Sequence, residues 1–251
     1  MKLTFLGTGT STGVPEIGCD CEVCTSNDPR DKRLRVSLFV EVEDKKILID
    51  CGPDFREQML ANPVDRIDAV LITHEHYDHV GGIDDLRPFC RFGPVNIYAE
   101  KYVSKAIHSR IPYVFQENKY PGVPNISLHE IDIHSFEIDG LKITPIRLLH
   151  GRLPIFGYKI GKMAFLTDLK TIPEEEFAKL KDLDVLIINA LHFKEHISHE
   201  TVEDAFRNIE KINPKRAYLI HLGHRFGPHA IKEKQMPENV FAAYDGLKID
   251  L

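Results

Sequence analysis

Four side chains of metal-binding type lie within six positions, directly after a predicted buried strand. The strand covers residues 69–73 (AVLIT), and the four side chains belong to His74, His76, Asp78 and His79. Alternate residues of an extended chain point the same way, so His74 and His76 share a direction, while Asp78 and His79 turn onto a neighbouring position. Neutral imidazole and carboxylate suit Zn²⁺, Mn²⁺ or Fe²⁺. The H-x-H-x-D-H motif therefore predicts a metal centre at a strand end rather than a solvated polar loop.

Apolar runs predict an α/β chain. Strands are predicted at residues 2–6, 36–42, 46–50, 69–73, 95–99, 141–149, 163–167, 184–189 and 216–221. Helices are predicted at residues 54–61, 101–108, 173–181 and 201–211, and the last begins with a Thr201–Asp204 pair that resembles a capping box. Residues 110–124 are predicted to form a long loop. No repeat or long linker divides the chain, so we expect one domain over residues 1–251, made of two strand-rich halves.

Net charge and hydropathy argue against nucleic acid and membranes as partners of this protein. The net charge is −6 and the pI is about 6.1, which argues against a nucleic-acid substrate. No apolar run approaches the roughly 20 residues that a membrane helix needs. The apolar stretch at the N-terminus is short for a signal peptide. We therefore expect a cytoplasmic protein that contacts neither membrane nor nucleic acid.

The H-x-H-x-D-H motif after a buried strand resembles the metallo-β-lactamase superfamily. The resemblance implies an αββα sandwich of two mixed sheets flanked by helices, with a two-metal site at one edge. It also implies later ligands, and three predicted strands do end in His150, Asp168 and His221. By this resemblance one ion is held by His74, His76, His150 and Asp168, and the other by Asp78, His79, Asp168 and His221. Asp50, which ends the run KILID, matches the residue that orients a metal-bound histidine.

Three of the five cysteines form a second candidate metal site. Cys19, Cys21 and Cys24 have the spacing C-x-C-x₂-C, and an odd number of cysteines makes no disulfide framework. A structural zinc ion takes four ligands, and His224 is the expected fourth. The alternative is a set of free thiols.

The N-terminal cysteines, the H-x-H-x-D-H motif and a closing H-x₂-H together resemble PhnP-type phosphodiesterases, and PqqB-type relatives share part of the pattern. The resemblance implies hydrolysis of a small, cyclic phosphodiester by a metal-activated hydroxide, with manganese, zinc or iron at the active site, and a homodimer. It also implies that His199, in the run SHET, protonates the leaving group. His192 and His196 are nearby alternatives, expected at the surface or the pocket rim.

Three other functions stay open. An RNA-processing nuclease of the same superfamily would share the ligands, but only 17 residues separate His150 from Asp168, too few for a tRNA-gripping arm. A thioesterase or lactonase would share Asp168, yet only 30 residues follow His221, too few for a helical substrate domain. A non-catalytic metal-binding protein would keep the ligands without turnover.

Two segments near the N-terminus have open interpretations. Arg33, Arg35 and Ser37 could contact a substrate phosphate, or could belong to an exposed strand edge. The glycine-rich residues 7–13 do not match a nucleotide-binding fingerprint. They are expected to let the backbone pass close to the metal centre.

Overall fold

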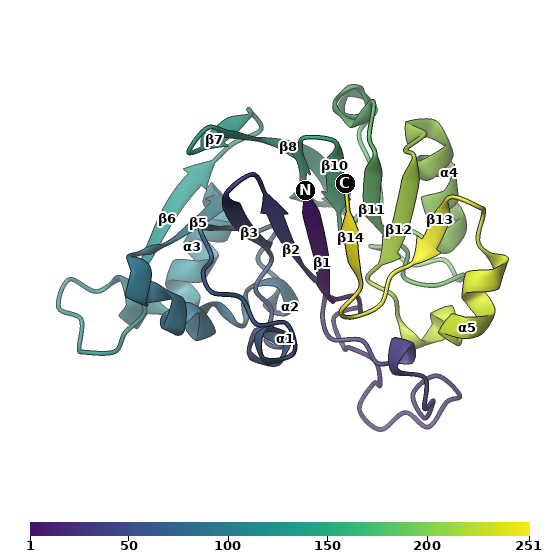
Figure 1. Ribbon diagram of the computed structural model, residues 1–251, viewed down its shortest axis with the longest axis horizontal. Coiled ribbons are helices and arrows are strands. Elements are labelled where there is room, and N and C mark those ends of the chain that lie inside the picture. The colour runs from purple at the N-terminus through teal and green to yellow at the C-terminus, as the bar shows by residue number, and fades with distance from the viewer.

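Two seven-stranded sheets pack face to face in the computed structural model, which describes residues 1–251 (Figure 1). The first sheet has the order β14-β1-β2-β3-β4-β5-β6, and the second has the order β13-β12-β11-β10-β9-β8-β7. Both sheets are mixed, because an antiparallel part adjoins a parallel part in each. Helices α1, α2 and α3 lie on the side of the first sheet, and α4 and α5 on the side of the second (Figure 1). The expected αββα sandwich is confirmed.

The elements of the first sheet come from both ends of the chain. Its strands are β1 (Lys2–Gly7), β2 (Ser37–Val42), β3 (Lys45–Ile49), β4 (Ala69–Leu71), β5 (Val95–Glu100), β6 (Ile126–Ile131) and β14 (Lys248–Asp250). Its helices are α1 (Phe55–Ala61), α2 (Tyr77–Val80) and α3 (Lys101–Arg110), with 3₁₀ turns at Pro29–Asp31, Ile83–Phe92 and Pro112–Phe115.

The second sheet is continuous in sequence. Its strands are β7 (Phe136–Ile138), β8 (Leu141–His150), β9 (Leu153–Ile160), β10 (Met163–Leu166), β11 (Val185–Asn189), β12 (Arg216–Ile220) and β13 (Val240–Ala242). Its helices are α4 (Val202–Ile212) and α5 (His229–Lys232), with 3₁₀ turns at Glu174–Leu180, His224–Phe226 and Glu233–Gln235. No helix in the structure has the length and apolar character needed to cross a membrane.

The predicted strands are all present. Five further strands, the four-residue helices α2 and α5, and the type of one predicted helix were not anticipated. Strands β7, β13 and β14 have three residues each, too few for a periodic pattern. Strand β6 mixes polar residues into the strand, and β9 contains proline and glycine. The helix predicted over residues 173–181 is a 3₁₀ helix. There the carboxylate of Glu176 accepts a hydrogen bond from the Arg147 backbone, a contact with β8 that local sequence does not encode.

Three apolar clusters hold the layers together. The central cluster joins both sheets, for example through Phe5 and Leu71 from the first and Phe156 and Phe165 from the second. The two outer clusters bury the opposite faces of the sheets against the helices. Since both faces of each sheet are buried, the strand ends are fixed in place. Residues that leave those ends are therefore precisely positioned relative to one another.

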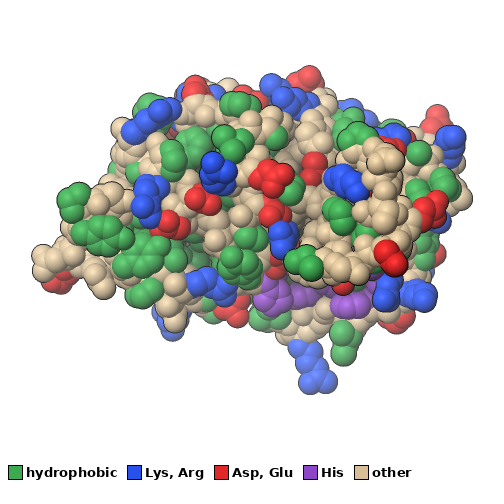
Figure 2. All heavy atoms as spheres, turned by 90° about the horizontal axis from the view of Figure 1, so that it is seen from below, with side chains coloured by type: hydrophobic (Ala, Val, Ile, Leu, Met, Phe, Trp, Pro, Cys, Tyr) green, Lys and Arg blue, Asp and Glu red, His purple; other side chains and the backbone are tan.

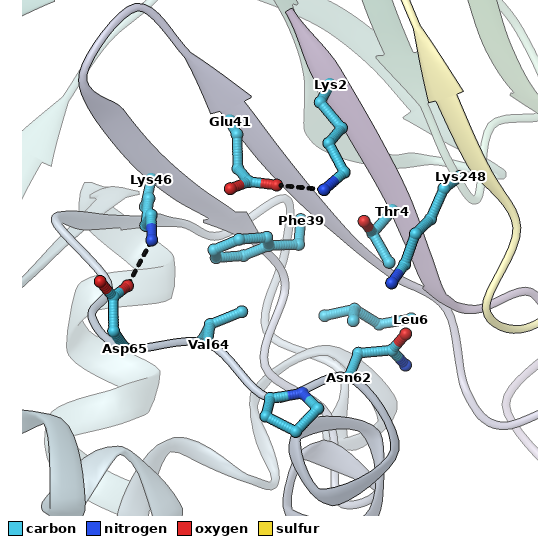
Figure 3. Close-up of a pocket in the computed structure, with 11 residues that line it drawn as sticks. Lys2, Thr4, Leu6, Phe39, Glu41, Lys46, Asn62, Val64, Asp65 and Lys248 are labelled. Carbon is cyan, nitrogen blue, oxygen red and sulfur yellow. Dashed lines mark hydrogen bonds and ion pairs between the residues drawn. The ribbon is translucent and has the colours of Figure 1, made fainter.

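A hollow of about 310 Å³ lies on the outer face of the first sheet, beside the chain termini (Figure 3). Lys2 and Lys46 at its rim are paired with Glu41 and Asp65, and Lys248 points into it. None of the predicted ligands lines this hollow. It is separate from the candidate metal centre described below.

Candidate metal centre

The predicted ligands meet because their strands end at one edge of the sandwich. His74 and His76 follow β4, His150 ends β8, Asp168 follows β10, and His221 follows β12. Asp168 and His221 have left-handed backbones, with φ of +57° and +55°. Such a conformation is uncommon for residues other than glycine and is found at functional sites. Histidine side chains gather in a recess of this face (Figure 2).

His74, His76 and His150 form the first group. Each offers a ligand atom within 4.8 Å of the others. The Nδ1–H of His150 donates to the Ser198 carbonyl at 2.9 Å. The Thr73 hydroxyl donates to an Asp50 carboxylate, so it accepts from His74 Nδ1 at 3.0 Å. These contacts fix the tautomers and leave both Nε2 atoms free to bind a metal, and His74 Nε2 is buried without a hydrogen-bond partner.

The second group consists of Asp78, His79, Asp168 and His221, all buried. His79 Nε2 lies 3.1 Å from Asp78 Oδ2 and 3.3 Å from Asp168 Oδ2, and His221 Nε2 lies 3.1 Å from Asp168 Oδ1. The Nε2 atoms of both histidines nevertheless have no partner with hydrogen-bond geometry. His79 Nδ1 contacts Asp50 Oδ2 at 2.7 Å, as the sequence predicts for a residue that orients a ligand.

The two groups differ in charge. Burial lowers the pKa of His74 well below its usual value, so this imidazole is neutral. Burial opposes charge on Asp168 as well, but His221 and His79 hold the pKa of that carboxyl well below its usual range. Although burial acts against it, Asp168 raises the pKa of His221 to about 9. Without a metal, protonated His79 and His221 therefore pair with the two carboxylates of the second group, and a bound divalent cation would take the place of those protons.

The donor set fits divalent metal ions. Buried nitrogens without hydrogen-bond partners are costly in free energy, and a cation bound to their lone pairs removes that cost. Imidazole nitrogen and carboxylate oxygen are ligands of Zn²⁺, Mn²⁺ and Fe²⁺. His74, His76 and His150 would hold one ion, and Asp78, His79, Asp168 and His221 the other.

Asp168 lies in the second group, one of the two groups to which the resemblance assigns it. Its carboxylate also lies within ligand distance of His150 and His199. It does not join His74 and His76 in one group. The bridge between two ions that the resemblance implies for Asp168 stays a prediction.

His199 lies at the junction of the two groups. Its ring centroid is 4.6 Å from that of His150 and 4.8 Å from that of His221. Burial lowers the pKa of His199 to about 3, and its Nδ1 is 3.9 Å from Asp168 Oδ1. This position suits either proton transfer or metal binding. Of the two alternatives, His196 is partly exposed with its ring 5.1 Å from that of His199, whereas His192 is more buried than expected.

The cysteine cluster forms the second predicted site. The sulfur atoms of Cys19, Cys21 and Cys24 lie 3.2, 3.5 and 3.5 Å from the Nδ1 atom of His224. A tetrahedral zinc site with Zn–S of about 2.3 Å and Zn–N of about 2.0 Å places sulfur and nitrogen about 3.5 Å apart. The backbone N–H of Cys24 is the main reason that the pKa of Cys21 is lowered to about 7, which favours the thiolate. The four side chains lie close enough together to hold one metal ion, and these distances suit zinc.

Three orienting groups were not anticipated from the sequence. Thr73 and the Ser198 carbonyl fix two histidines of the first group, and Glu16 lies 3.4 Å from His224 Nε2. Only Thr73 could have been found, because it directly precedes the motif. Ser198 and Glu16 reach their partners through the tertiary fold, 48 and 208 positions away along the chain.

Comparison with known families agrees with this geometry. The β-lactamase superfamily domain matches residues 45–222, more than half of the chain. The chain belongs to the β-lactamase superfamily. Its two mixed sheets flanked by helices are the metallo-β-lactamase fold, a fold of metal-dependent hydrolases, which implies use of divalent metal.

Two solved structures are similar to this chain over its whole length. A crystal structure described as a new diphosphatase from the PhnP family superposes with a TM-score of 0.93 at 38% identity, covering 100% of this chain and 97% of that one. Zn²⁺-bound PqqB from Methylobacterium extorquens has a TM-score of 0.81 at 20% identity, with both chains fully covered, and shows the shared fold.

A curated relative in Porphyromonas gingivalis, named octanoyltransferase, is 49% identical over 99% of this chain but only 51% of its own length. The chain therefore spans about half of that relative's length. The name octanoyltransferase describes the whole relative, including the half that this chain does not match.

Proposed function

We propose that the chain is a metal-dependent phosphodiesterase that hydrolyses a small, cyclic phosphodiester. The observation that carries the proposal is the pair of adjoining ligand groups, one of three histidines and one that includes two carboxylates, with His199 at their junction. Its similarity to a PhnP-family diphosphatase over the whole chain supports phosphorus chemistry. Two-metal sites of this kind are typical of enzymes that cleave phosphate esters.

Two divalent ions, when bound, would activate water at neutral pH and neutralise charge that develops on the phosphate. Residues of this chain would orient the metal ligands and transfer the proton. Thr73 and Asp50 hold His74 and His79 in fixed orientations, which keeps the ligand groups preorganised. His199 would give its proton to the leaving oxygen. Since burial keeps its imidazole neutral, a negatively charged substrate beside it is needed to raise its pKa.

A small substrate is favoured by the segment between His150 and Asp168. Strands β9 and β10 and the short turns around them occupy this segment, so it forms sheet rather than a protruding arm. An RNA-gripping extension of the kind expected for a tRNA nuclease has no counterpart there. We therefore keep nucleic acid out of the proposed substrate class.

The metals, location and assembly are part of the same proposal. We propose Mn²⁺ or Zn²⁺, with Fe²⁺ as a third option, at the two ligand groups, because these ions share the donor preference. We propose a structural Zn²⁺ at the Cys19, Cys21, Cys24 and His224 cluster. Free thiols suit the cytoplasm, and a homodimer is the proposed assembly.

Hydrolysis of bis(p-nitrophenyl) phosphate by metal-depleted protein resupplied with Mn²⁺, Zn²⁺ or Fe²⁺ tests the proposal. We expect turnover that is abolished in Asp168→Ala. Asp132→Ala, which removes an exposed carboxylate on the second half of the chain, is the matched control and should keep full activity. Folded, metal-loaded protein with no turnover of this compound or of a cyclic phosphodiester would rule the proposal out.

Hydrolysis of an acyl thioester is the second candidate, favoured by the relative named octanoyltransferase. Octanoyl thioesters should therefore be included in the same assay. Turnover of the thioester without turnover of any phosphodiester would favour this second function.

A further inference from the structure

The hollow on the outer face of the first sheet is lined by two rows of side chains that cross its strands (Figure 3). In the first row, Thr4 of β1 lies opposite Lys248 of β14 on one side and Phe39 of β2 on the other. Residues directly opposite each other in antiparallel strands have Cβ atoms about 4.5–5.5 Å apart on the same face of the sheet. These three side chains therefore form one continuous surface inside the hollow.

The second row has its charges paired. Glu41 of β2 lies opposite Lys2 of β1 and Lys46 of β3. The Oε2 atom of Glu41 is 3.4 Å from the Nζ atom of Lys2, and Lys46 forms a second ion pair with Asp65 (Figure 3). Each of these two lysines thus has a carboxylate partner of its own.

Lys248 differs from the other two lysines of the hollow. Its ammonium group forms no ion pair or hydrogen bond in the protein, the residue opposite it is Thr4 rather than an acid, and it points into the hollow (Figure 3). Three lysines and two carboxylates line the hollow, so one positive charge is left unbalanced. A ligand with a single negative charge would neutralise it.

Two further polar side chains in the hollow have unused hydrogen bonds. Thr4 is only 5% exposed, and its hydroxyl has no hydrogen-bond partner in the protein. Asn62, at the end of α1, points into the hollow, and its amide nitrogen donates to the Gln58 carbonyl at 3.3 Å with a second N–H to spare (Figure 3). An ammonium, a hydroxyl and an amide N–H are suitable donors for the two oxygens of a carboxylate.

The floor of the hollow is apolar. Phe39 and Leu6 are almost completely buried beneath the polar groups, and Val64 lies beside them (Figure 3). Small-molecule sites combine an apolar lining with a few placed polar groups, and their volumes begin at about 300 Å³. The volume of about 310 Å³ suits a ligand of roughly ten non-hydrogen atoms, at roughly 30 Å³ for each water-sized group.

We propose that the hollow binds a small monocarboxylic acid with an apolar body. Its carboxylate would accept hydrogen bonds from Lys248, Thr4 and Asn62, while its apolar body would lie on Phe39 and Leu6. The single unbalanced charge favours a carboxylate over a phosphate monoester, which carries nearly two negative charges at neutral pH. None of the predicted metal ligands lines the hollow, so the proposal is independent of the proposed function.

Titration of ¹⁵N-labelled, zinc-loaded protein with phenylacetate, a probe of this size and charge, tests the proposal by two-dimensional NMR. We expect saturable shifts of the backbone amides of Thr4, Phe39 and Lys248, with little change at His74 or Asp168. Acetate lacks the apolar body and 2-phenylethanol lacks the charge. Each should therefore bind at least about 10-fold more weakly than phenylacetate.

Two variants test the donors. Lys248→Gln should weaken phenylacetate binding by about 10- to 100-fold, the range for a hydrogen bond to a charged group, and Thr4→Val by about 3- to 10-fold. Lys105→Gln is the matched control, because Lys105 is an exposed lysine of α3 that does not line the hollow. It should bind phenylacetate as the wild type does. The amide signals of residues outside the hollow show whether each variant is folded.

Any of four results would overturn the proposal. Phenylacetate could cause no saturable shift at the hollow up to about 10 mM, which is weaker binding than a specific site of this kind gives. Its affinity could be unchanged in Lys248→Gln, or 2-phenylethanol could bind equally well, and either result would exclude a role for charge. Shifts confined to residues around His74 and Asp168 would show that the carboxylate binds the metal ions instead.

Discussion

At the scale of single residues, the candidate site depends on side chains that fix its ligands. Asp50 contacts His79 Nδ1 and also accepts hydrogen bonds from the Thr73 backbone and hydroxyl, all inside the protein. The same Thr73 hydroxyl then holds His74. One buried carboxylate thereby orients one histidine from each ligand group, so the two groups are mechanically linked.

We predict that Asp50→Asn weakens metal binding at the site by about 10- to 100-fold, the range seen when groups that orient metal ligands are removed. The amide keeps the volume but loses the charge that faces His79. Competition with a chromophoric chelator measures the affinity. Asp65→Asn, at an exposed carboxylate, is the control. An affinity equal to that of the wild type would contradict the prediction.

We predict that His199→Asn slows cleavage of substrates with poor leaving groups by about 10²- to 10⁴-fold, because these need a proton in the transition state. The loss should be much smaller with a p-nitrophenolate leaving group. The kcat values over a series of leaving groups measure the effect. His192→Asn and His196→Asn show whether either alternative acts instead.

An equal loss over the whole leaving-group series, accompanied by loss of metal, would identify His199 as a ligand with His150 and Asp168. Metal content of the variant therefore has to be measured alongside its kinetics.

At the scale of elements, short local motifs fix the positions of the loops that carry the site residues. Helix α4 begins with a capping box, in which Asp204 N donates to Thr201 Oγ1 at 3.1 Å and Thr201 N donates to Asp204 Oδ2 at 2.9 Å. This fixes the chain two residues after His199. The loop that carries Cys19, Cys21 and Cys24 contacts His224, which follows the ligand His221 by three positions. This loop is thereby attached to the metal centre next to His221.

We predict that Cys21→Ser loses one equivalent of zinc and lowers the melting temperature. Structural zinc sites contribute directly to folding, and a serine hydroxyl is a poor zinc ligand. A chelator should lower the melting temperature of the wild type but have much less effect on this variant. Cys90→Ser, outside the cluster, is the control. Equal zinc content in wild type and Cys21→Ser would contradict the assignment.

At the scale of the whole molecule, the C-terminal segment forms the edge strand of the first sheet, next to β1. Strand β14 pairs with β1, and Met1 N donates to Leu251 O at 3.0 Å, so the termini lie together (Figure 1). Asp245, just before β14, accepts from the Thr8 hydroxyl at 2.7 Å and from Leu34 N at 2.6 Å. This carboxyl connects the end of the chain to the loop beside the metal centre.

We predict that Asp245 gives stability a pH dependence. Burial raises its pKa to about 6 from an ordinary 3.8, so the folded state takes up the proton first. Its contribution is most favourable below pH 4 and is lost as the pH rises from 4 to 6. The change is at most about 3 kcal/mol. Denaturant unfolding over this range measures it, and Asp245→Asn should remove this part of the slope. Parallel pH profiles for the two proteins would contradict it.

The sequence by itself was sufficient for features encoded locally. Apolar runs located nine strands, and four ligands could be found because each directly follows or ends such a run: His74, His150, Asp168 and His221. The capping pair of α4 and the cysteine spacing are likewise local. The short strands β7, β13 and β14, and a 3₁₀ helix set by a contact with β8, have no such local signal.

Tertiary structure alone decided how those residues are combined. It grouped the ligands into a set of three histidines and a set that includes two carboxylates, and it brought Asp168 together with His79 and His221. It also buried the Arg33 guanidinium and left that of Arg35 partly exposed, a difference that sequence could not show. The reason is physical: whether a guanidinium is internal or open depends on contacts with Ala243 or Ser11, and such contacts exist only once distant strands have packed.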